Sequence, residues 1–234
     1  MTYLDYLPNF FSGLAVTAAV SGLAFALALA LGVLAAVARQ WGSVVPRAIA
    51  TTYIEVIRNT PVLVQIFLVY FGLPAFGLRL PAFAAGVLAL AVNGGAYLAE
   101  IIRAGFRAVP RGQVEAARTL DLGRRQTLLD VVLPQALRLV YPPVVNELVQ
   151  MILATSLLST IALNELTGET LIANAITFQT MQVFTAALVL YLVLTGLVSW
   201  GARWLGRVAF HPPLDVRGIR RQAPLRRFSF GRTS

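Results

Sequence analysis

The sequence predicts an all-α integral membrane protein with five transmembrane helices and a two-helix cytoplasmic loop between the third and the fourth. Three observations predict this fold. Of the 234 residues, 58% are hydrophobic and only 12% are charged, whereas soluble domains carry about 25% charged residues. The apolar residues form runs of about 20 residues, the length that a helix needs to cross a bilayer. The arginines are concentrated in the connections that would lie on one side of the membrane.

Each apolar run predicts one span. The predicted spans cover residues 12–38, 59–78, 80–99, 142–163 and 183–202. No charge lies between Asp5 and Arg39, and the fourth run contains one charge, Glu147, in its first two turns. With their connections, these runs form a predicted transmembrane domain over residues 1–210.

The arginine distribution predicts the orientation, because cytoplasmic loops carry an excess of basic residues. With the N-terminus outside, Arg79 lies outside together with Asp5, Glu165 and Glu169, and every other arginine lies on the cytoplasmic side. The C-terminus is then cytoplasmic, and residues 211–234 form a basic cytoplasmic tail. An anionic membrane surface therefore accounts for the net charge of +9 without nucleic acid.

The composition excludes several kinds of site. The chain has no cysteine, which excludes disulfides and thiolate metal sites. Its one histidine, His211, lies in the arginine-rich tail, so neither a metal site nor a Ser-His-Asp triad is predicted. The chain has no lysine and no Gly-x-x-x-x-Gly-Lys-Ser/Thr loop, so it is not itself an ATPase. We expect no cofactor and no metal on this chain.

The loop at residues 103–139 is charged and helical in pattern. Pro110 opens one short helix, residues 121–123 form a turn, and residues 124–133 form a second helix that Pro134 ends or kinks. A loop held at both ends by spans can pass a displacement from a soluble partner to the membrane helices. Its sequence also resembles a DNA-binding helix-turn-helix, but no third helix completes a core.

The loop resembles the EAA loop of ABC importer permeases. Glu115-Ala116-Ala117 and Leu133-Pro134 stand at the spacing of that family. The family glycine is replaced by Asp121, a residue type that tolerates a left-handed turn, and we expect Gly123 to take over part of the role. The resemblance therefore assigns coupling to an ATPase to a set of seven residues. They are Glu115, Ala116, Ala117, Asp121, Gly123, Leu133 and Pro134.

Further motifs resemble the polar amino acid branch of the same family. Residues 58–65 resemble the opening of its second span, and residues 96–103 resemble the end of its third. Asn146-Glu147 and residues 155–157 resemble its fourth span, although Leu153-Ala154 stand where many relatives have Lys-Asp. The resemblance extends over most of the chain, from about residue 10 to about residue 207.

This resemblance implies the membrane-spanning permease subunit of an ATP-binding-cassette importer in the bacterial inner membrane. Its substrates would be polar amino acids or close derivatives. The implied partners are two ABC ATPase subunits that bind ATP and Mg, a second permease subunit (identical or homologous), and a periplasmic or lipid-anchored amino-acid-binding protein. Membrane lipid is a further partner, and nucleic acid is not.

Polar residues within the spans are candidates for the substrate path, because burying them in lipid costs free energy. They are Asn93, Glu100, Asn146, Glu147, Gln150, Thr155 and Ser156. Each also has a structural interpretation. The asparagines would bond a neighbouring helix, Glu100 would pair with Arg103, Glu147 would pair with Arg58, and the hydroxyl groups would bond their own helix.

Three other functions remain open on the residues alone. A stand-alone secondary transporter or channel subunit would need coupling charges within its spans and no ATPase, and five spans are few for two inverted halves. A membrane-embedded enzyme would need a catalytic cluster, and none is found. A membrane-tethered DNA-binding regulator would use the loop as its helix-turn-helix. Co-purification of a nucleotide-binding subunit distinguishes the importer from all three.

Overall fold

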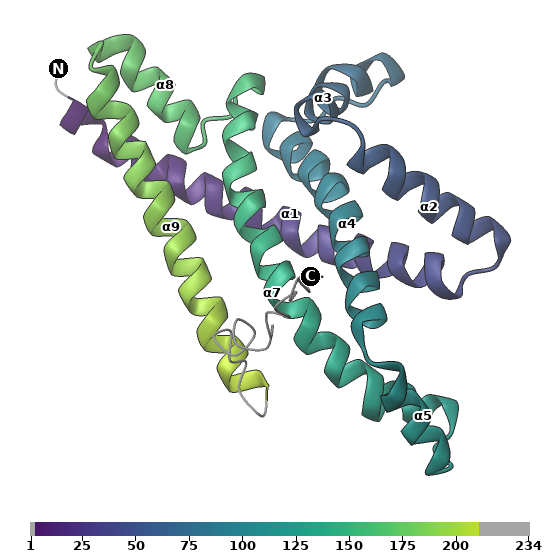
Figure 1. Cartoon of the computed structure of the whole chain (residues 1–234). Coiled ribbons are helices and arrows are strands. Elements are labelled where there is room, and N and C mark those ends of the chain that lie inside the picture. The colour runs from purple at the N-terminus through teal and green to yellow at the C-terminus, as the bar shows by residue number, and fades with distance from the viewer. Residues whose placement is uncertain (1–2, 211–234) are drawn as a thin grey trace, which may run out of the picture.

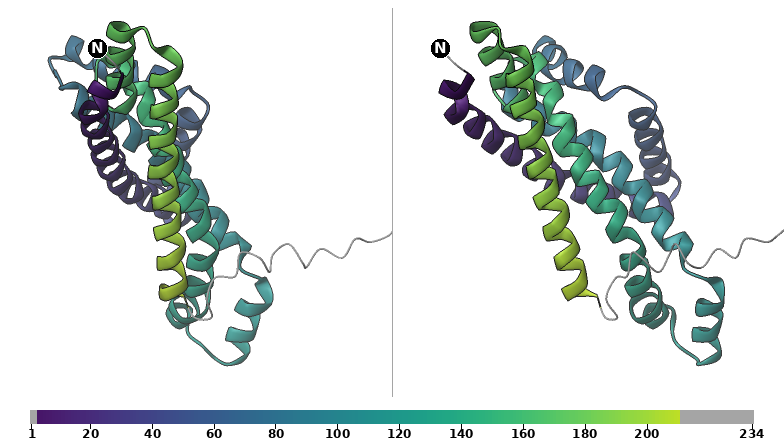
Figure 2. Two further views of the ribbon diagram at one scale, coloured as in Figure 1. Left: turned by 90° about the vertical axis from the view of Figure 1, so that its left-hand side faces the viewer. Right: turned by 60° about the vertical axis from the view of Figure 1, so that its left-hand side comes forward.

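A computed structural model describes residues 3–210, and the predicted basic tail at 211–234, with His211, lies outside the described residues. The described part consists of helices and their connections, without β-strands. In chain order its elements are η1 (Tyr3–Tyr6), α1 (Leu7–Trp41), α2 (Val44–Arg58), α3 (Val62–Phe67), η2 (Leu68–Gly72), η3 (Leu73–Phe76), α4 (Ala82–Ala108), α5 (Arg111–Thr119), α6 (Arg124–Gln126), η4 (Thr127–Val132), α7 (Leu133–Ala154), η5 (Thr155–Ile161), α8 (Leu166–Thr177) and α9 (Thr180–Ala209). Figure 1 and Figure 2 show α8 and the start of α1 at one end of the molecule and α5 at the other.

Within residues 3–210, four helical runs are long and apolar enough to cross a membrane. They are Leu4–Trp41, Ala82–Ala108, Arg124–Ile161 and Thr180–Ala209. A fifth candidate is the helix pair Val44–Arg58 and Val62–Phe76, if the bent pair counts as one span. The chain is therefore an all-helical membrane protein with four or five candidate spans, in agreement with the class that its composition predicts.

The helix pair α2 and α3 differs from the straight span predicted at residues 59–78. The chain turns by 109° between the two helices. Pro61 explains the break, because it disfavours helical backbone at Thr60 and has no N–H for a helical hydrogen bond. The apolar run after it forms the short helix α3, which continues as the π-helical η2 and the 3₁₀-helical η3. The helix α2 occupies what the sequence analysis treated as a connection.

The second loop helix and the fourth predicted span form one helical run over residues 124–161. We expected Pro134 to end or kink the loop helix and the span to begin at Pro142. Instead the π-helical turn η4 precedes Pro134, and both Pro142 and Pro143 lie inside α7. Membrane helices tolerate proline, because local π adjustments and neighbouring groups satisfy the backbone atoms that proline leaves without a partner. The loop and the span are thus one continuous element.

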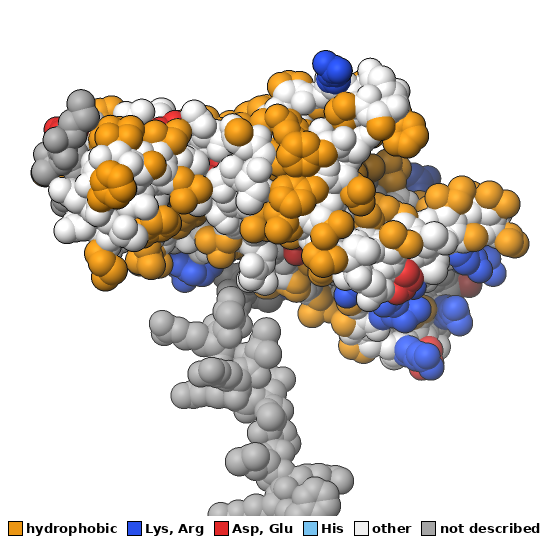
Figure 3. All heavy atoms as spheres, turned by 90° about the horizontal axis from the view of Figure 1, so that it is seen from above, with side chains coloured by type: hydrophobic (Ala, Val, Ile, Leu, Met, Phe, Trp, Pro, Cys, Tyr) orange, Lys and Arg blue, Asp and Glu red, His pale blue; other side chains and the backbone are white. Residues whose placement is uncertain are grey.

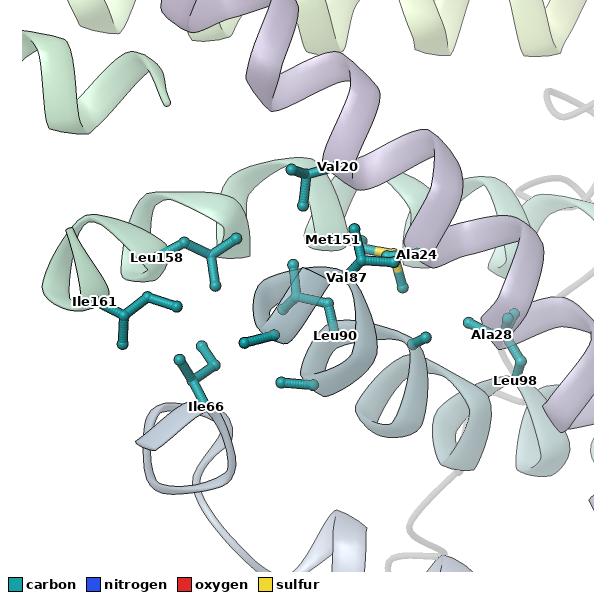
Figure 4. Packing of buried hydrophobic residues seen from close by; sticks show 13 residues of the cluster. Val20, Ala24, Ala28, Ile66, Val87, Leu90, Leu98, Met151, Leu158 and Ile161 are labelled. Atoms are coloured by element: carbon teal, nitrogen blue, oxygen red, sulfur yellow. The ribbon is translucent and has the colours of Figure 1, made fainter. Parts of the chain in front are cut away.

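The main core lies where α1, α4 and α7 pack with α3 and η5 (Figure 4). Its buried residues include Val20, Ala24, Ala28, Ile66, Val87, Leu90, Leu98, Met151, Leu158 and Ile161. The helices α1 and α4 are closely packed at Gly32, where an added Cβ would lie 2.7 Å from the Cβ of Leu98 and 3.1 Å from the carbonyl oxygen of Gly95. Small residues allow this approach, and the packing it permits drives helix association in lipid.

The long helix α9 exposes many large apolar side chains. Those on its described surface include Leu188, Val189, Leu192, Val193, Leu197, Trp200, Trp204, Leu205 and Val208. Figure 3 shows hydrophobic side chains over much of the face seen from above. Exposed apolar surface of this extent marks a membrane-facing or partner-facing surface rather than one in contact with water.

The short helix α8 is fixed by a buried carboxylate that the sequence analysis had placed only as an outer charge. Glu165 is fully buried, and its carboxylate accepts hydrogen bonds from the Tyr191 hydroxyl (2.7 Å), the Gly168 N–H (2.8 Å) and the Thr17 hydroxyl (3.4 Å). Burial raises the pKa of this carboxyl above its usual value, against the opposing effect of its hydrogen bonds. The network joins α1, α8 and α9 at one end of the molecule.

The contact at Gly32 predicts the effect of one substitution. The variant Gly32→Leu should separate α1 from α4 and lower the melting temperature of the detergent-purified protein, at a cost of about 1–3 kcal/mol for overpacking. The matched control is Gly22→Leu on the same helix, because an added Cβ there meets nothing within 4 Å. Equal melting temperatures for the two variants would contradict the close approach of the helices.

Candidate functional site

A cavity of about 380 Å³ lies between the α2–α3 bend, α4 and α7. It is lined by Thr60, Pro61, Val62, Leu90, Asn93, Tyr97, Glu147, Gln150, Met151 and Ala154. Its lining combines apolar residues with polar side chains from the bend, α4 and α7. This is the combination that small-molecule sites use, in which apolar walls exclude water and a few polar groups orient the ligand.

The cavity brings together three of the predicted path residues, Asn93, Glu147 and Gln150. The predicted pair of Glu147 with Arg58 is not formed. Within residues 3–210 Glu147 makes no ion pair, and the Arg58 guanidinium lies 5.4 Å from the centre of the Tyr97 ring. The cavity therefore contains a carboxylate that no cation of the described chain neutralises.

The other predicted path residues do not line this cavity. Thr155 is fully buried and donates its hydroxyl to the carbonyl of Ile152 at 2.7 Å. Ser156 donates to the carbonyl of Leu153 at 2.8 Å. Both hydroxyl groups thus bond their own helix, which was the structural interpretation of these residues. Asn146 is exposed and lies outside the cavity.

Sequence analysis missed the cavity residues on the bend and on α4. Thr60, Pro61 and Tyr97 line the cavity, and Gln65 lies behind it, 8% exposed. Gln65 donates to the backbone at the bend and accepts from the side chain of Asn93 at 3.0 Å. The motif at residues 58–65 was identified by resemblance to a family, but only the bend in the structure shows which of its residues line the cavity.

The helical part of the loop begins with α5, which carries the Glu-Ala-Ala motif. Glu115 and Ala116 are exposed, whereas Ala117 is 3% exposed. The two alanines of the motif therefore differ, because Ala116 is exposed and Ala117 is covered by the chain itself. Within residues 3–210 Glu115 makes no ion pair.

The turn after α5 is the left-handed turn that the sequence predicts. Asp121 has a φ of 57°, and the N–H of Leu122 bonds the carbonyl of Ala117 at 3.1 Å, which closes the helix end. Gly123 has a φ of −59°, so it does not share the left-handed role. Instead its N–H donates to the side chain of Gln126 at 3.1 Å at the start of α6.

Comparison with known proteins decides the family. A family model described as "Binding-protein-dependent transport system inner membrane component" matches residues 28–209. The chain belongs to this family. It is the membrane-spanning permease subunit of an ABC importer and a multi-pass protein of the inner membrane, with a transport rather than a catalytic role. Membership implies an ATPase and a binding protein as partners.

Two relatives and two solved structures illustrate the similarity. The permease is 38% identical over 205 residues to the glutamine transport system permease protein GlnP of Escherichia coli (strain K12), covering 86% of this chain and 93% of that protein. It is 39% identical over 197 residues to the octopine transport system permease protein OccM of Rhizobium radiobacter, covering 80% and 79%. The crystal structure of an amino acid ABC transporter with histidines matches with a TM-score of 0.83 and 36% identity, over 89% of this chain and 99% of that one. The MetNI methionine ABC transporter, at 19% identity and a TM-score of 0.66, shares the fold.

The remaining predicted path residue, Glu100, lies in a cluster of charges in the permease rather than in the cavity. Its carboxylate bonds the guanidinium groups of both Arg39 on α1 and Arg103 on α4. Arg39 also contacts Glu55 on α2 at 3.3 Å. The predicted pair with Arg103 is confirmed, and the cluster further ties α1 and α2 to α4.

The charge cluster predicts a difference between its two glutamates. The Glu100 side chain is 16% exposed and contacts two arginines, whereas that of Glu55 is 55% exposed and contacts one. The variant Glu100→Gln should therefore destabilise the purified permease by about 1–3 kcal/mol, because two partly buried guanidinium groups lose their counter-charge. Glu55→Gln is the matched control, with an expected cost of about 0–1 kcal/mol. Thermal unfolding in detergent measures both, and a larger loss for Glu55→Gln would contradict the cluster.

Proposed function

We propose that this permease carries polar amino acids or close derivatives through the cavity between the bend, α4 and α7. The cavity is the observation that supports this proposal, because its lining combines the polar residues Asn93, Glu147 and Gln150 with apolar residues. A free amino acid needs both kinds of surface, since its backbone groups are charged and its side chain is partly apolar. The names of the relatives, which state glutamine and octopine transport, support the same substrate class.

The complete transporter would contain further copies and subunits. We infer a second permease subunit, identical or homologous, two ABC ATPase subunits that bind ATP and Mg, and a periplasmic or lipid-anchored amino-acid-binding protein. The family description, which names binding-protein dependence, supports the last of these. No cofactor is required on this chain for such a role.

The loop at residues 103–139 would be the element that couples the ATPase to transport. Its exposed Glu115 and Ala116 offer a charge and a small side chain to a partner. Asp121 and Gly123 set the turn between its helices, and Leu133-Pro134 lie in the same helical run as the cavity residues of α7. Ala117 would support the loop from inside, because it is buried.

Docking of the ATPase tests this proposal. The variant Ala116→Leu should block docking by steric overlap, and Glu115→Lys should weaken it by about tenfold or more through charge reversal at the interface. Co-purification of the ATPase and ATP-driven amino acid uptake in proteoliposomes measure both effects. The control is Ala175→Leu, an exposed alanine on α8, which should change neither. Normal association and uptake in both loop variants would remove the loop from coupling.

The orientation would place the N-terminus outside and α5 in the cytoplasm. The opposite positions of α8 and α5 in Figure 1 support this orientation, because the arginines around α5 belong on the cytoplasmic side. The chain contains no cysteine, so a thiol reagent that labels a single-cysteine variant can react only at the introduced position.

Labelling of intact cells with a membrane-impermeant thiol reagent tests this orientation. Cysteines introduced at the exposed Leu78 and Met181 should label from outside. A cysteine at Gly112 on α5 should label only after the inner membrane is permeabilised. Labelling of the Gly112 position in intact cells would reverse the orientation.

A further inference from the structure

The side chain of Gln65 makes an unusual set of hydrogen bonds at the α2–α3 bend. Its Nε2 donates to the carbonyl oxygens of Ile57 (2.8 Å) and Thr60 (3.2 Å) and lies 2.8 Å from the Thr60 hydroxyl oxygen. Its Oε1 lies 3.0 Å from the Nδ2 of Asn93. One buried amide thus connects the end of α2, the bend and α4.

These partners determine which way both amides point. The carbonyl oxygens of Ile57 and Thr60 can only accept, so the end of Gln65 that faces them must be its NH₂ group. The other end is then the carbonyl oxygen, which can only accept from Asn93. Asn93 must therefore use its NH₂ group toward Gln65. Its own carbonyl oxygen, Oδ1, takes no part in this bond and can accept from another donor, and Asn93 is one of the residues that line the cavity.

The hydroxyl group of Thr60 also has its hydrogen-bond partners within the protein. Its Oγ1 lies 2.9 Å from the carbonyl oxygen of Val56, to which it donates, so its proton is not available to a ligand. Glu147 adds a carboxylate from α7, which makes no ion pair within residues 3–210. Asn93 on α4 and Glu147 on α7 both line the cavity, so each has an acceptor oxygen that it can offer to a ligand.

We infer that Gln65 is a positioning residue for substrate selection, which holds the bend and turns the Asn93 carbonyl toward the cavity so that it receives a donor group of the substrate. The inference rests on the proposed function. Acceptor oxygens of Asn93 and Glu147 favour a donor-rich group, and the α-ammonium group of an amino acid is the donor that all members of the proposed substrate class share. Gln65 would not touch the substrate and would act through Asn93 and Thr60.

The experiment uses the assembled transporter, with its ATPase and binding protein, in proteoliposomes. Initial uptake of L-glutamine, L-glutamate and L-arginine is measured for wild type, Gln65→Met, Asn93→Ala and the double variant. Each single variant should lower uptake of the transported probe about tenfold, the effect of one lost buried hydrogen bond. The double variant should lie within about twofold of the worse single variant, because contacting residues that act together are not additive.

Multiplied losses in the double variant would overturn the inference, because they would mean that Gln65 and Asn93 act separately. Gln182→Met, an exposed glutamine at the start of α9, is the matched control and should leave uptake unchanged. If wild type transports neither these probes nor any other polar amino acid or close derivative, including octopine, the proposed function fails. Multiplied losses in a working transporter overturn only the role of Gln65.

A second variant tests the amide orientation even if Gln65→Met does not assemble. Asn93→Asp keeps an acceptor toward the cavity but places a second oxygen against the Gln65 carbonyl, so it should reduce uptake as severely as Asn93→Ala. Wild-type uptake by Asn93→Asp would show that Asn93 does not donate to Gln65, and the inference would fail.

Discussion

The close approach of α1 to α4 is the contact on which the rest of the described structure depends. In lipid, helices gain little from the hydrophobic effect and associate through dense packing and hydrogen bonds. Gly32 permits dense packing, because it has no side chain and α1 therefore lies against the α4 backbone at Gly95. Hydrogen bonds then add α2, because the Tyr53 hydroxyl donates to the carbonyl of Val92 on α4 at 2.7 Å, and the charge cluster at Glu100 closes the same three helices at one end. With α4 held on this side, its other surface is free to form a cavity wall.

The cavity arises from a second constraint, the break at Pro61. In a straight helix the backbone N–H and carbonyl groups bond one another, so only side chains are available to a ligand. The bend instead exposes carbonyl groups, and membrane proteins keep such irregular backbone only where protein groups satisfy it or where it lines a cavity. Gln65 satisfies these carbonyl groups at the bend. The backbone carbonyl groups at the bend would be destabilising without a partner. With Gln65 as their partner, the bend can line the cavity.

One helical run connects the loop that carries the Glu-Ala-Ala motif with the cavity. Residues 124–161 begin in the loop and continue to the cavity, where Glu147 and Gln150 lie on the same helix as Leu133. A displacement of the loop at residue 124 would therefore reach the cavity wall along one helical run, whereas a displacement of α5 would first cross the turn at Asp121. At the opposite end, the Glu165 network fixes α8 to α1 and α9, so that end of the molecule is also connected to the membrane helices by buried hydrogen bonds.

The sequence by itself determined the membrane class, the helical character and the family, because long apolar runs and motif spacing are local properties that need no knowledge of contacts. It also determined the left-handed turn at Asp121, which depends on a few neighbouring residues. The tertiary structure alone decided which polar residues meet. Thr155 and Glu147 look equally functional along the chain, but helix rotation buries the first and turns the second into the cavity. The hydrogen bonds of Gln65 to Asn93, and of Glu165 to Thr17 and Tyr191, were invisible for the same reason, since these partners lie on other helices and only packing brings them within hydrogen-bond distance.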